Sequence, residues 1–451
     1  MSLLAIDWSI VGIKAAQLIL CLSILVVLHE MGHFLPAKWF KCRVEKFYLF
    51  FDPWFSLVKK KIGETEYGIG WLPLGGYVKI SGMIDESMDK DQLNQPPQPW
   101  EFRSKPAWQR LIIMIGGVTV NLILGFLIFA MVLYKWGDDY LPAKNVTYGI
   151  FVDSVGQKVG LRDGDKILGV GGKPLQRFET LNKEIILNEA KTLQIERDGQ
   201  LMDLQIPEGT TRGLIRKKGE PLGMPKFPAI IDSINPKIAK FLDGKLQPGD
   251  QVIGLNGVPT RSFVEFNYLK SRYKDTAVNV QVLRGSDTAT VRLQLSKEGA
   301  VGMYCKPMNY FLKFEHKNYE FFESFPAGVK KGWETLVANV QNFKLLFTSK
   351  EVKASESLGS FISIGGMFGS SWDWERFWSM TALLSIILAF MNILPIPALD
   401  GGHVIFTLYE MITGRKPGDK FMEYAQIVGM VLLLGLMAYA LGLDVFRLFK
   451  G

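Results

Sequence analysis

The chain has 451 residues, of which 52 are Lys or Arg and 44 are Asp or Glu, so its formal net charge is +8. Hydrophobic residues make up 48% of the chain and its mean hydropathy is +0.13, which excludes a disordered chain and argues against one that is soluble throughout. Three cysteines in this length exclude a disulfide-rich scaffold and a multi-cysteine zinc module.

The apolar residues are concentrated in four runs. Three of them contain no charged residue and are long enough to cross a bilayer as helices, at residues 111–134, 378–399 and 424–443. The first run, residues 15–28, is shorter and is followed by a His-Glu pair. A cleaved signal peptide is the alternative for this run. No basic segment precedes it and no small-residue cleavage site follows, so we expect a retained helix.

The four runs predict a polytopic α-helical membrane protein. We expect transmembrane helices within residues 1–35, 106–136, 376–400 and 424–445, with loops at 36–105 and 401–423 and a large polar block between the second and third helices. Lys and Arg are frequent in the loop at 36–105, and Arg415, Lys416 and Lys420 lie in the loop at 401–423. By the positive-inside rule both loops are cytoplasmic, and both termini and the large block are external.

The external block contains an internal repeat. Residues 161–174 match residues 246–259, 85 positions further on, through a Gly-Asp pair, a short apolar stretch and a turn that ends in proline. Each copy predicts a turn, a buried strand and a second turn. Two copies are too few for a solenoid. We therefore expect two β-rich modules, at residues 140–215 and 220–308, followed by a connector at 309–375.

The repeated segments resemble the bacterial, circularly permuted PDZ domain. The resemblance implies that such a module binds an extended peptide along a sheet edge, with the peptide carboxylate in a nest of backbone amides. In the first module the nest would be formed by Tyr148, Gly149 and Ile150. The second module has residues 228–230 at this place and lacks the glycine. The alternative is that both modules are spacers or steric gates.

Apolar residues in the connector recur in steps of three and four from Phe322 to Phe347. This pattern predicts one stripe of a helix that begins near Ser324, with Pro326 in its first turn. We favour a helix on the membrane surface, because three lysines lie off the stripe. Packing against the repeat modules is the alternative.

The sequence His29-Glu30-Met31-Gly32-His33 directly follows the first apolar run. Histidines at i and i+4 lie on one face of a helix, about 40° apart, so both imidazoles can point at one metal ion. Glu30 lies beside that ion, where a carboxylate can take a proton from water. Two histidines and a glutamate are costly at the edge of hydrocarbon without a function, so the motif predicts a zinc site rather than a structural pair.

A catalytic zinc site needs a third protein ligand and an open fourth position. The segment from Asn392 to His403 closes the third apolar run, and its two prolines, Pro395 and Pro397, end the helix there. Asp400 and the two glycines after it are therefore expected on irregular backbone at membrane depth. Such backbone is tolerated inside protein or beside water.

The motif His-Glu-x-x-His in the first span and Asn-x-x-Pro-x-x-x-x-Asp-Gly in a later span together resemble the site-2 protease family of intramembrane zinc metalloproteases. The resemblance covers nearly the whole chain. It implies that His29, His33 and Asp400 hold one Zn²⁺ per chain and that Glu30 is the general base and acid. It also implies that Asn392 holds the substrate backbone or the developing oxyanion.

The remaining metal-binding residue types are assigned no ligand role. His403 is a candidate fourth ligand, but four protein ligands would close the site, so we expect it to support the site or the fold. Cys21, Cys42 and Cys305 are predicted in the first span, in the cytoplasm and outside, so we expect neither a disulfide nor a metal site from them. His316 is expected to be solvated.

A segment of the first cytoplasmic loop, residues 74–79, resembles the Gly-Tyr-Val-Lys part of the family's membrane-associated β-hairpin. The residues that would pair with an unwound substrate are Gly75, Gly76, Tyr77 and Val78. We expect residues 66–72 to form the partner strand; an ordinary loop hairpin is the alternative. Residues 47–54 depart from the family, because they are bulky where many members have Phe-x-Ile-Gly-Phe-Gly.

The sequence therefore predicts a four-span membrane protein with a cytoplasmic β-hairpin and two external PDZ-like modules. The resemblance implies a bacterial inner-membrane zinc endopeptidase, with the His-Glu motif near the cytoplasmic side. Its substrates would be single-span anti-sigma factors already trimmed outside, and remnant signal peptides, selected by ectodomain size. Membrane lipid is an expected partner and nucleic acid is not. A non-catalytic membrane adaptor and, far behind it, a transporter with inverted repeats are the alternatives.

Overall fold

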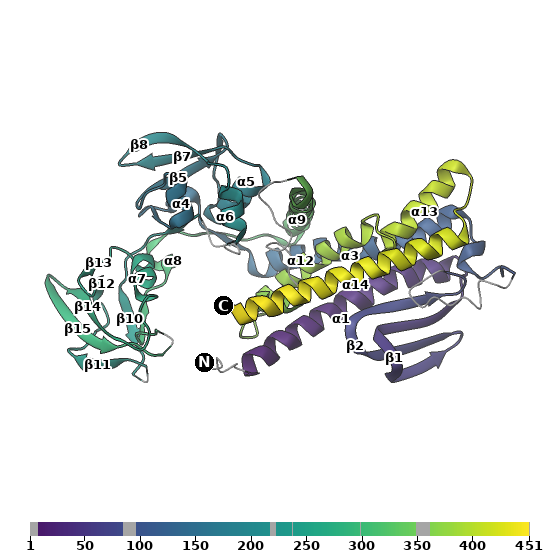
Figure 1. Cartoon of the computed structure of the whole chain (residues 1–451), viewed down its shortest axis with the longest axis horizontal. Helices are drawn as coiled ribbons and strands as arrows, with labels where there is room; N and C mark the ends of the chain where they lie inside the picture. The colour runs from purple at the N-terminus through teal and green to yellow at the C-terminus, as the bar shows by residue number, and fades with distance from the viewer. Residues whose placement is uncertain are drawn as a thin grey trace. The chain divides into compact units, whose positions relative to one another are not determined.

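Four long apolar helices form the framework of one structural unit (Figure 1). They are α1 (Trp8–Trp39), α3 (Ala107–Trp136), α12 (Trp374–Ile393) and α14 (Asp419–Lys450). The computed structural model describes residues 8–83, 96–216, 222–236, 238–297, 299–348 and 361–450. Each of the four helices is long and apolar enough to cross a membrane, which confirms the number of spans expected from the sequence.

The contacts within the chain separate this unit from the repeat block. Residues 1–137, 318–347 and 358–451 belong to the helical unit, and residues 138–317 and 348–357 to the other. Within the helical unit α3 contacts α1, α12 and a further helix, α13 (Asp400–Thr413). At the crossing of α1 and α3, Gly32 meets Gly116, and a Cβ atom on Gly32 would lie 2.5 Å from the Gly116 carbonyl oxygen. The two backbones approach this closely only because both residues are glycine.

The segment after the third span differs from the expected loop. Helix α12 ends at Ile393, as the two prolines predict, but residues 401–423 were expected to be a loop and most of α13 lies there. Val404 of α13 packs with Ile113 and Met114 of α3, so the helix is stabilised by burial of its inner face. Fourteen residues are too few to cross a bilayer, which is why span length did not reveal this helix.

Residues 44–80 form two long antiparallel strands, β1 (Val44–Ile62) and β2 (Thr65–Ile80), that double back on each other. The first part of β1 lies between the two halves of β2, since Tyr48 pairs with Gly68 on one side and with Tyr77 on the other. The last part of β1 pairs with residues 65–70. The segments are therefore ordered 56–62, 65–70, 44–49 and 76–80, and the last of them forms an edge.

This register corrects the expected hairpin. Residues 66–72 do not pair with the segment around Tyr77, because residues 44–49 lie between them. The first strand can turn back because Phe50 and Trp54 adopt positive φ angles of 67° and 74°. The bulky segment at 47–54 thus supplies the central strand and its reversal, which sequence rules assign to glycine.

The second unit contains the two repeat modules. The first has a sheet ordered β6-β5-β7-β8 and the second a sheet ordered β11-β15-β14-β12-β13. The first sheet comprises β5 (Lys166–Val170), β6 (Lys173–Pro174), β7 (Thr192–Arg197) and β8 (Gln200–Gln205). The second comprises β11 (Lys240–Asp243), β12 (Gln251–Leu255), β13 (Val258–Pro259), β14 (Ala277–Arg284) and β15 (Asp287–Gln294). The repeat in the sequence is therefore also a repeat of structure.

Each module adds a helix and a two-stranded pair to its sheet. The helices are α5 (Leu181–Leu187) and α7 (Phe263–Lys270). The pairs are β4 (Ile150–Val152) with β9 (Gly223–Pro225), and β10 (Ile231–Ile234) with β16 (Met303–Cys305). Because β9 belongs to the first module, that module extends to Pro225 instead of ending at 215 as expected.

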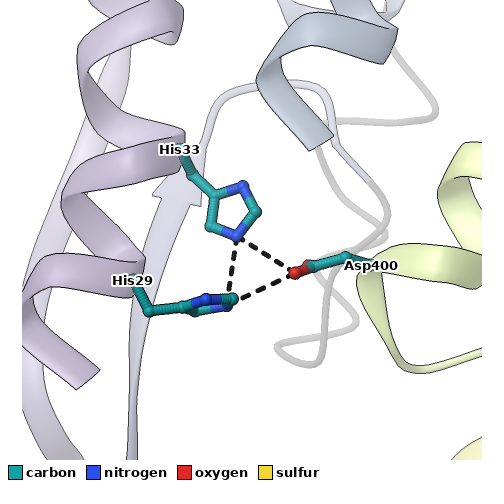
Figure 2. A group of neighbouring side chains, drawn as sticks. All are labelled: His29, His33 and Asp400. Carbon is teal, nitrogen blue, oxygen red and sulfur yellow. Dashed lines mark hydrogen bonds and ion pairs between the residues drawn. The ribbon is translucent and has the colours of Figure 1, made fainter. Parts of the chain in front are cut away.

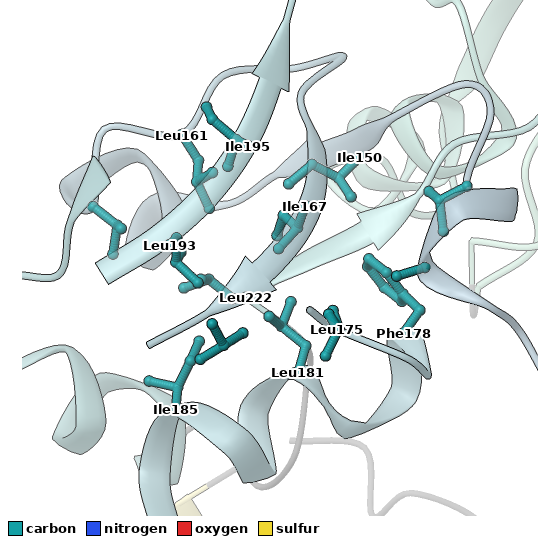
Figure 3. Packing of buried hydrophobic residues seen from close by; sticks show 14 of the residues in the cluster. Ile150, Leu161, Ile167, Leu175, Phe178, Leu181, Ile185, Leu193, Ile195 and Leu222 are labelled. Atoms are coloured by element: carbon teal, nitrogen blue, oxygen red, sulfur yellow. The ribbon is translucent and has the colours of Figure 1, made fainter. Parts of the chain in front are cut away.

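The core of the first module joins both parts of it (Figure 3). Its deeply buried residues, each at most 1% exposed, include members of β4, β5, β7, α5 and the approach to β9, namely Ile150, Ile167, Leu181, Ile185, Leu193, Ile195 and Leu222. The shorter elements of this unit are β3 (Asp138–Tyr140), α4 (Ser154–Lys158), α6 (Thr210–Arg216), α8 (Met308–Phe311) and β17 (Glu315–Lys317). Strand β17 pairs with β3.

The Gly-Asp pair of each repeat has one structural role. Asp165 and Asp250 are both 1% exposed, and each accepts two hydrogen bonds from one arginine, Arg197 and Arg284 respectively. Each aspartate also accepts a hydrogen bond from the backbone amide of the residue three positions earlier. This bond closes the turn before the strand. The ion pair thus fixes the turn to the strand that carries the arginine.

The described part of the connector includes the helices α9 (Phe321–Thr348) and α11 (Phe361–Met367). Helix α9 begins one turn before the expected start, with Pro326 inside it. It packs on α3 through glycines: Gly328 lies against Ala130 and Gly332 against the Phe126 ring. Much of the predicted apolar stripe is exposed, including Phe322 at 83% and Trp333 at 58%. An exposed apolar stripe of this kind fits a helix that contacts lipid.

We expect the second module to lose stability in acid through Asp250. Its hydrogen bonds with Arg284 lower the pKa of Asp250, so its stabilisation is present above the unfolded pKa of about 3.9 and is lost as the pH falls below it. Asp250→Asn should cost about 1–3 kcal/mol at pH 7, less than a fully buried pair because the Arg284 side chain is 38% exposed. The stability of the second module in this variant should also fall less as the pH is lowered.

Hydrogen exchange of β12 and β14 in the full-length protein in detergent, at pH 7 and at about pH 2.5, with the rates corrected for the intrinsic effect of pH on exchange, measures both effects. Asp243→Asn, an exposed aspartate of the same sheet, is the matched control. Equal acid sensitivity of the wild type and Asp250→Asn would contradict the prediction.

Candidate metal centre

Helix α1 and the first residue of α13 bring three metal-binding side chains together (Figure 2). The Nε2 atoms of His29 and His33 are 3.3 Å apart. Each also lies 3.3 Å from Oδ2 of Asp400. Histidines one helical turn apart and an aspartate about 370 residues later thus form an equilateral triangle of donor atoms. They are the three residues that the family resemblance implies as metal ligands.

The triangle fits a tetrahedral zinc ion. Zinc binds histidine nitrogen and carboxylate oxygen at about 2.0–2.2 Å, and two ligands of such a tetrahedron are about 3.3–3.5 Å apart. Nδ1 of His33 donates to the Ile113 carbonyl at 2.8 Å, so in the neutral ring Nε2 carries a lone pair. Oδ2 of Asp400 is buried without a hydrogen-bond donor among the described residues. Three lone pairs that face one another in this way require a cation between them.

One face of α3 forms the wall behind the three ligands. Residues 113, 117 and 121 are spaced by four, so they lie on one stripe of the helix. The Ile113 carbonyl accepts the hydrogen bond from His33. A Cβ atom on Gly117 would collide with Nε2 of His33 and would lie 2.6 Å from Cε1 of His29. Glycine at 117 therefore leaves the space that the metal ion needs.

The third residue of this stripe, Asn121, contacts the other histidine. Its side-chain amide nitrogen is 3.2 Å from Nδ1 of His29, while its Oδ1 is buried without a partner among the described residues. Exchanging the two amide atoms, which differ little in shape, gives Oδ1 a donor in Nδ1–H and leaves Nε2 of His29 free for metal. Ser385 of α12 donates to the Asn121 carbonyl at 2.6 Å.

The loop that precedes Asp400 is tightly held, and Asp400 with the two glycines after it begins α13 instead of lying on irregular backbone as expected. Residues 394–399 connect α12 to α13, and within them Ala398 adopts a positive φ of 79°, which is unfavourable for alanine. Its amide donates to Oε1 of Gln426 on α14 at 3.2 Å, and Gly429 of α14 lies against the Pro397 carbonyl. A strained residue held by a neighbouring helix places the carboxylate two positions later.

Glu30 lies between the metal ligands and the edge of the β-sheet. The Val78 amide is within hydrogen-bonding reach of the Glu30 carboxylate, and Glu30 interacts electrostatically with all three ligands. A Cβ atom on Gly76 would lie 2.6 Å from Cγ1 of Val26, so the edge segment passes close to α1. Of the four predicted pairing residues, Gly76, Tyr77 and Val78 lie on this edge, and Gly75, with φ of 153°, leads into it.

Asn392 also lies at the site. Its amide nitrogen is 3.2 Å from Nε2 of His29, the atom that faces the other two ligands. His403 is one turn after Asp400 on α13 and is not part of the donor triangle in the described structure. It lines a cavity of about 50 Å³ together with Arg110 and Glu410, which form an ion pair.

Two of the three amides of the predicted carboxylate nest are bonded within the module. The Gly149 amide donates to the Val146 carbonyl and the Ile150 amide to the Asp165 carbonyl. Tyr148 is 46% exposed, but Ile150 is fully buried. Sequence reasoning failed here because the glycine serves a turn: Gly149 has φ of 69° and packs against Gly164.

Sequence reasoning also missed Asn121 and Gln426. A signal for Asn121 was present, because an amide in the middle of an uncharged apolar run is costly in hydrocarbon unless it has a partner. Gln426 stands near the start of the fourth run, where a polar residue is ordinary.

We expect Asn121→Ala to lower zinc affinity about 10- to 100-fold, because His29 would lose the acceptor that orients it. Asn121→Asp keeps an oxygen acceptor and should bind zinc better than the alanine variant. Competition with a chromophoric chelator in detergent measures the affinity. Thr119→Ala, an exposed position of the same helix, is the control. Zinc affinity of Asn121→Ala equal to that of the wild type would show that Asn121 does not orient His29.

Known proteins match the chain over nearly its whole length. The model of peptidase family M50 matches residues 17–436. A candidate zinc metalloprotease of Treponema pallidum is 27% identical over 96% of this chain and 98% of its own length. The regulator of sigma E protease of Haemophilus influenzae is 27% identical over 95% of this chain and 98% of its own length. The chain therefore belongs to peptidase family M50, the site-2 protease family that its motifs resemble.

Proposed function

We propose that this protein is an intramembrane zinc endopeptidase that cleaves single-span membrane proteins. The observation that carries the proposal is the triangle of His29, His33 and Asp400, with mutual distances of 3.3 Å, inside a bundle of membrane-spanning helices. Membership of a peptidase family and relatives named as zinc metalloproteases support it.

The three ligands would hold the ion and would leave one coordination position for water or substrate. Bound zinc would supply a Lewis acid that makes water nucleophilic and polarises the scissile carbonyl. Glu30 would take the proton from the attacking water and pass it to the leaving amine. Its position beside the ligands and next to the Val78 amide supports this role.

Asn392 would bind the substrate once metal is present. Its amide donates to Nε2 of His29 in the structure, but this nitrogen cannot accept a hydrogen bond and bind metal with the same lone pair. The amide is then released toward the reacting carbonyl, where a hydrogen-bond donor stabilises developing negative charge.

The edge segment 76–80 would hold the substrate extended. A transmembrane helix has its peptide groups bonded internally, so cleavage requires it to unwind. The unwound stretch can pair with an exposed strand edge, and this edge passes beside Glu30. The role of Gly75, Gly76, Tyr77 and Val78 in pairing is part of the proposal.

The protein would act in the inner membrane of a bacterium, with the His-Glu motif near the cytoplasmic face and the repeat modules in the periplasm. The excess of Lys and Arg in residues 36–105 supports this orientation. The name of the Haemophilus influenzae relative and the placement of repeat modules between the second and third spans support anti-sigma factors, already trimmed outside, as substrates. Remnant signal peptides have the same single-span form. The PDZ-like modules would exclude substrates with large ectodomains.

Glu30→Gln tests the mechanism. The amide cannot accept the proton, so cleavage of a single-span model substrate by the purified, zinc-loaded protein should fall by about 10²- to 10⁴-fold. Zinc content, measured by elemental analysis, should stay at one ion per chain. Glu334→Gln, an exposed glutamate of the same unit, should leave the rate unchanged. Cleavage by Glu30→Gln at the wild-type rate would disprove the mechanism, and wild-type protein without zinc would disprove the site.

A further inference from the structure

A cluster of polar side chains inside the β1–β2 sheet connects Tyr77, on the edge segment, to the rest of the sheet. The Tyr77 hydroxyl donates to Oδ1 of Asp52 at 2.8 Å, and Ser56 donates to Oδ2 at 3.0 Å. The Tyr48 hydroxyl donates to Oε1 of Glu66 at 2.7 Å and lies 3.3 Å from Oγ of Ser56. Tyr77, Ser56, Tyr48 and Glu66 come from the four different strand segments of the sheet. Through these two hydrogen bonds, Asp52 links Tyr77 on the edge segment 76–80 to Ser56 on the segment 56–62.

The aromatic rings of the cluster are stacked. Tyr48 and Tyr77 have ring centroids 5.3 Å apart and planes inclined by 13°, and Phe51 also stacks on Tyr77, with centroids 6.0 Å apart. Nζ of Lys46 lies 3.5 Å from the Tyr77 hydroxyl. Burial and the neighbouring carboxylates raise the pKa of Tyr48 and of Tyr77, so both hydroxyls remain donors. Tyr77 is thus held by its ring and by its hydroxyl.

The backbone beside Asp52 is strained. Phe50, with φ of 67°, is in the left-handed region that favours glycine. Aligned on Phe47, the glycine-rich pattern Phe-x-Ile-Gly-Phe-Gly has glycine at 50 and at 52, where this chain has Phe and Asp. A strained backbone conformation persists only where surrounding contacts stabilise it. The hydrogen bonds that Asp52 accepts from Tyr77 and Ser56 are such contacts.

We propose that Asp52 is a positioning residue that fixes the register of the substrate strand relative to Glu30. This rests on the proposed function, in which the edge segment pairs with an unwound substrate. The edge lies beside α1, with the Val78 amide near Glu30, and β1 and β2 run next to that helix (Figure 1). Residues along a strand are about 3.3 Å apart, so a slip by one residue brings a different peptide bond to the metal. The hydrogen bond from Tyr77 to Asp52 fixes the Tyr77 side chain, and Tyr77 is part of the edge segment that would pair with the substrate.

The test uses the full-length, zinc-loaded protein with a single-span model substrate. Asp52→Ala should lower kcat/KM about 10-fold, as expected for the loss of a hydrogen bond to a charged group, and should spread cleavage over neighbouring peptide bonds. Mass spectrometry of the products reads the cleavage positions. Zinc content should not change. Tyr77→Phe should reproduce both effects, and the double variant should be no worse than Asp52→Ala alone, because the hydrogen bond between Tyr77 and Asp52 is already lost in Asp52→Ala.

Two further variants sharpen the result. Asp52→Asn keeps an oxygen acceptor for Tyr77 and should restore cleavage at one position. Glu64→Gln removes an exposed carboxylate from a turn of the same sheet and should behave as wild type. If Asp52→Ala does not fold, Tyr77→Phe, which removes a single oxygen atom, carries the test alone.

Asp52→Ala and Tyr77→Phe that cleave at the wild-type position with wild-type kcat/KM would overturn the proposal. So would a fall in activity that follows a fall in zinc content without a change in cleavage position, because a merely structural role predicts that result. A wild-type protein that cleaves no substrate would instead contradict the proposed function.

Discussion

Three lone pairs face one another at distances of 3.3 Å within the helical unit, and the arrangement of its helices follows from the need to hold them. Two imidazoles and a carboxylate in apolar surroundings repel one another unless a cation lies between them. Helix α1 supplies the two imidazoles at one-turn spacing, and α13 begins at the carboxylate. Helix α3 must then pass close behind, and the contact of Gly32 with Gly116 allows it to do so.

Local patterns revealed the parts of this site that depend on local geometry. His29 and His33 share a helix face by their spacing alone, and Pro395 and Pro397 end α12 before Asp400. The contact of Asn121 with His29 depends on how α3 packs against α1, so the sequence shows only an amide in an apolar run. The strand order of the β1–β2 sheet was beyond prediction because it depends on the reversal at Phe50, a residue type that rarely adopts positive φ.

In the repeat modules, too, the sequence predicted features that depend on local geometry and missed those that depend on contacts within the fold. The Gly-Asp pair predicted a turn and a strand correctly, because Asp165 and Asp250 close the turn through an amide three residues earlier. Glycine at 149 was misinterpreted as part of a ligand site, since a glycine that permits positive φ and one that exposes amides look identical in sequence. The bonds of those amides within the module distinguish the two.

The three residues of the candidate metal centre come from two helices that are far apart in the chain, so a metal ion bound there would couple metal binding to folding. An ion bound by α1 and α13 acts as a crosslink that closes a loop of more than 360 residues, from His33 to Asp400. Binding to the folded state alone adds stability that grows with the free metal concentration, by about 1.4 kcal/mol for each tenfold excess over the dissociation constant. With metal bound, the stability of the contact between α1 and α13 would therefore depend on the free metal concentration in the cell as well as on the sequence.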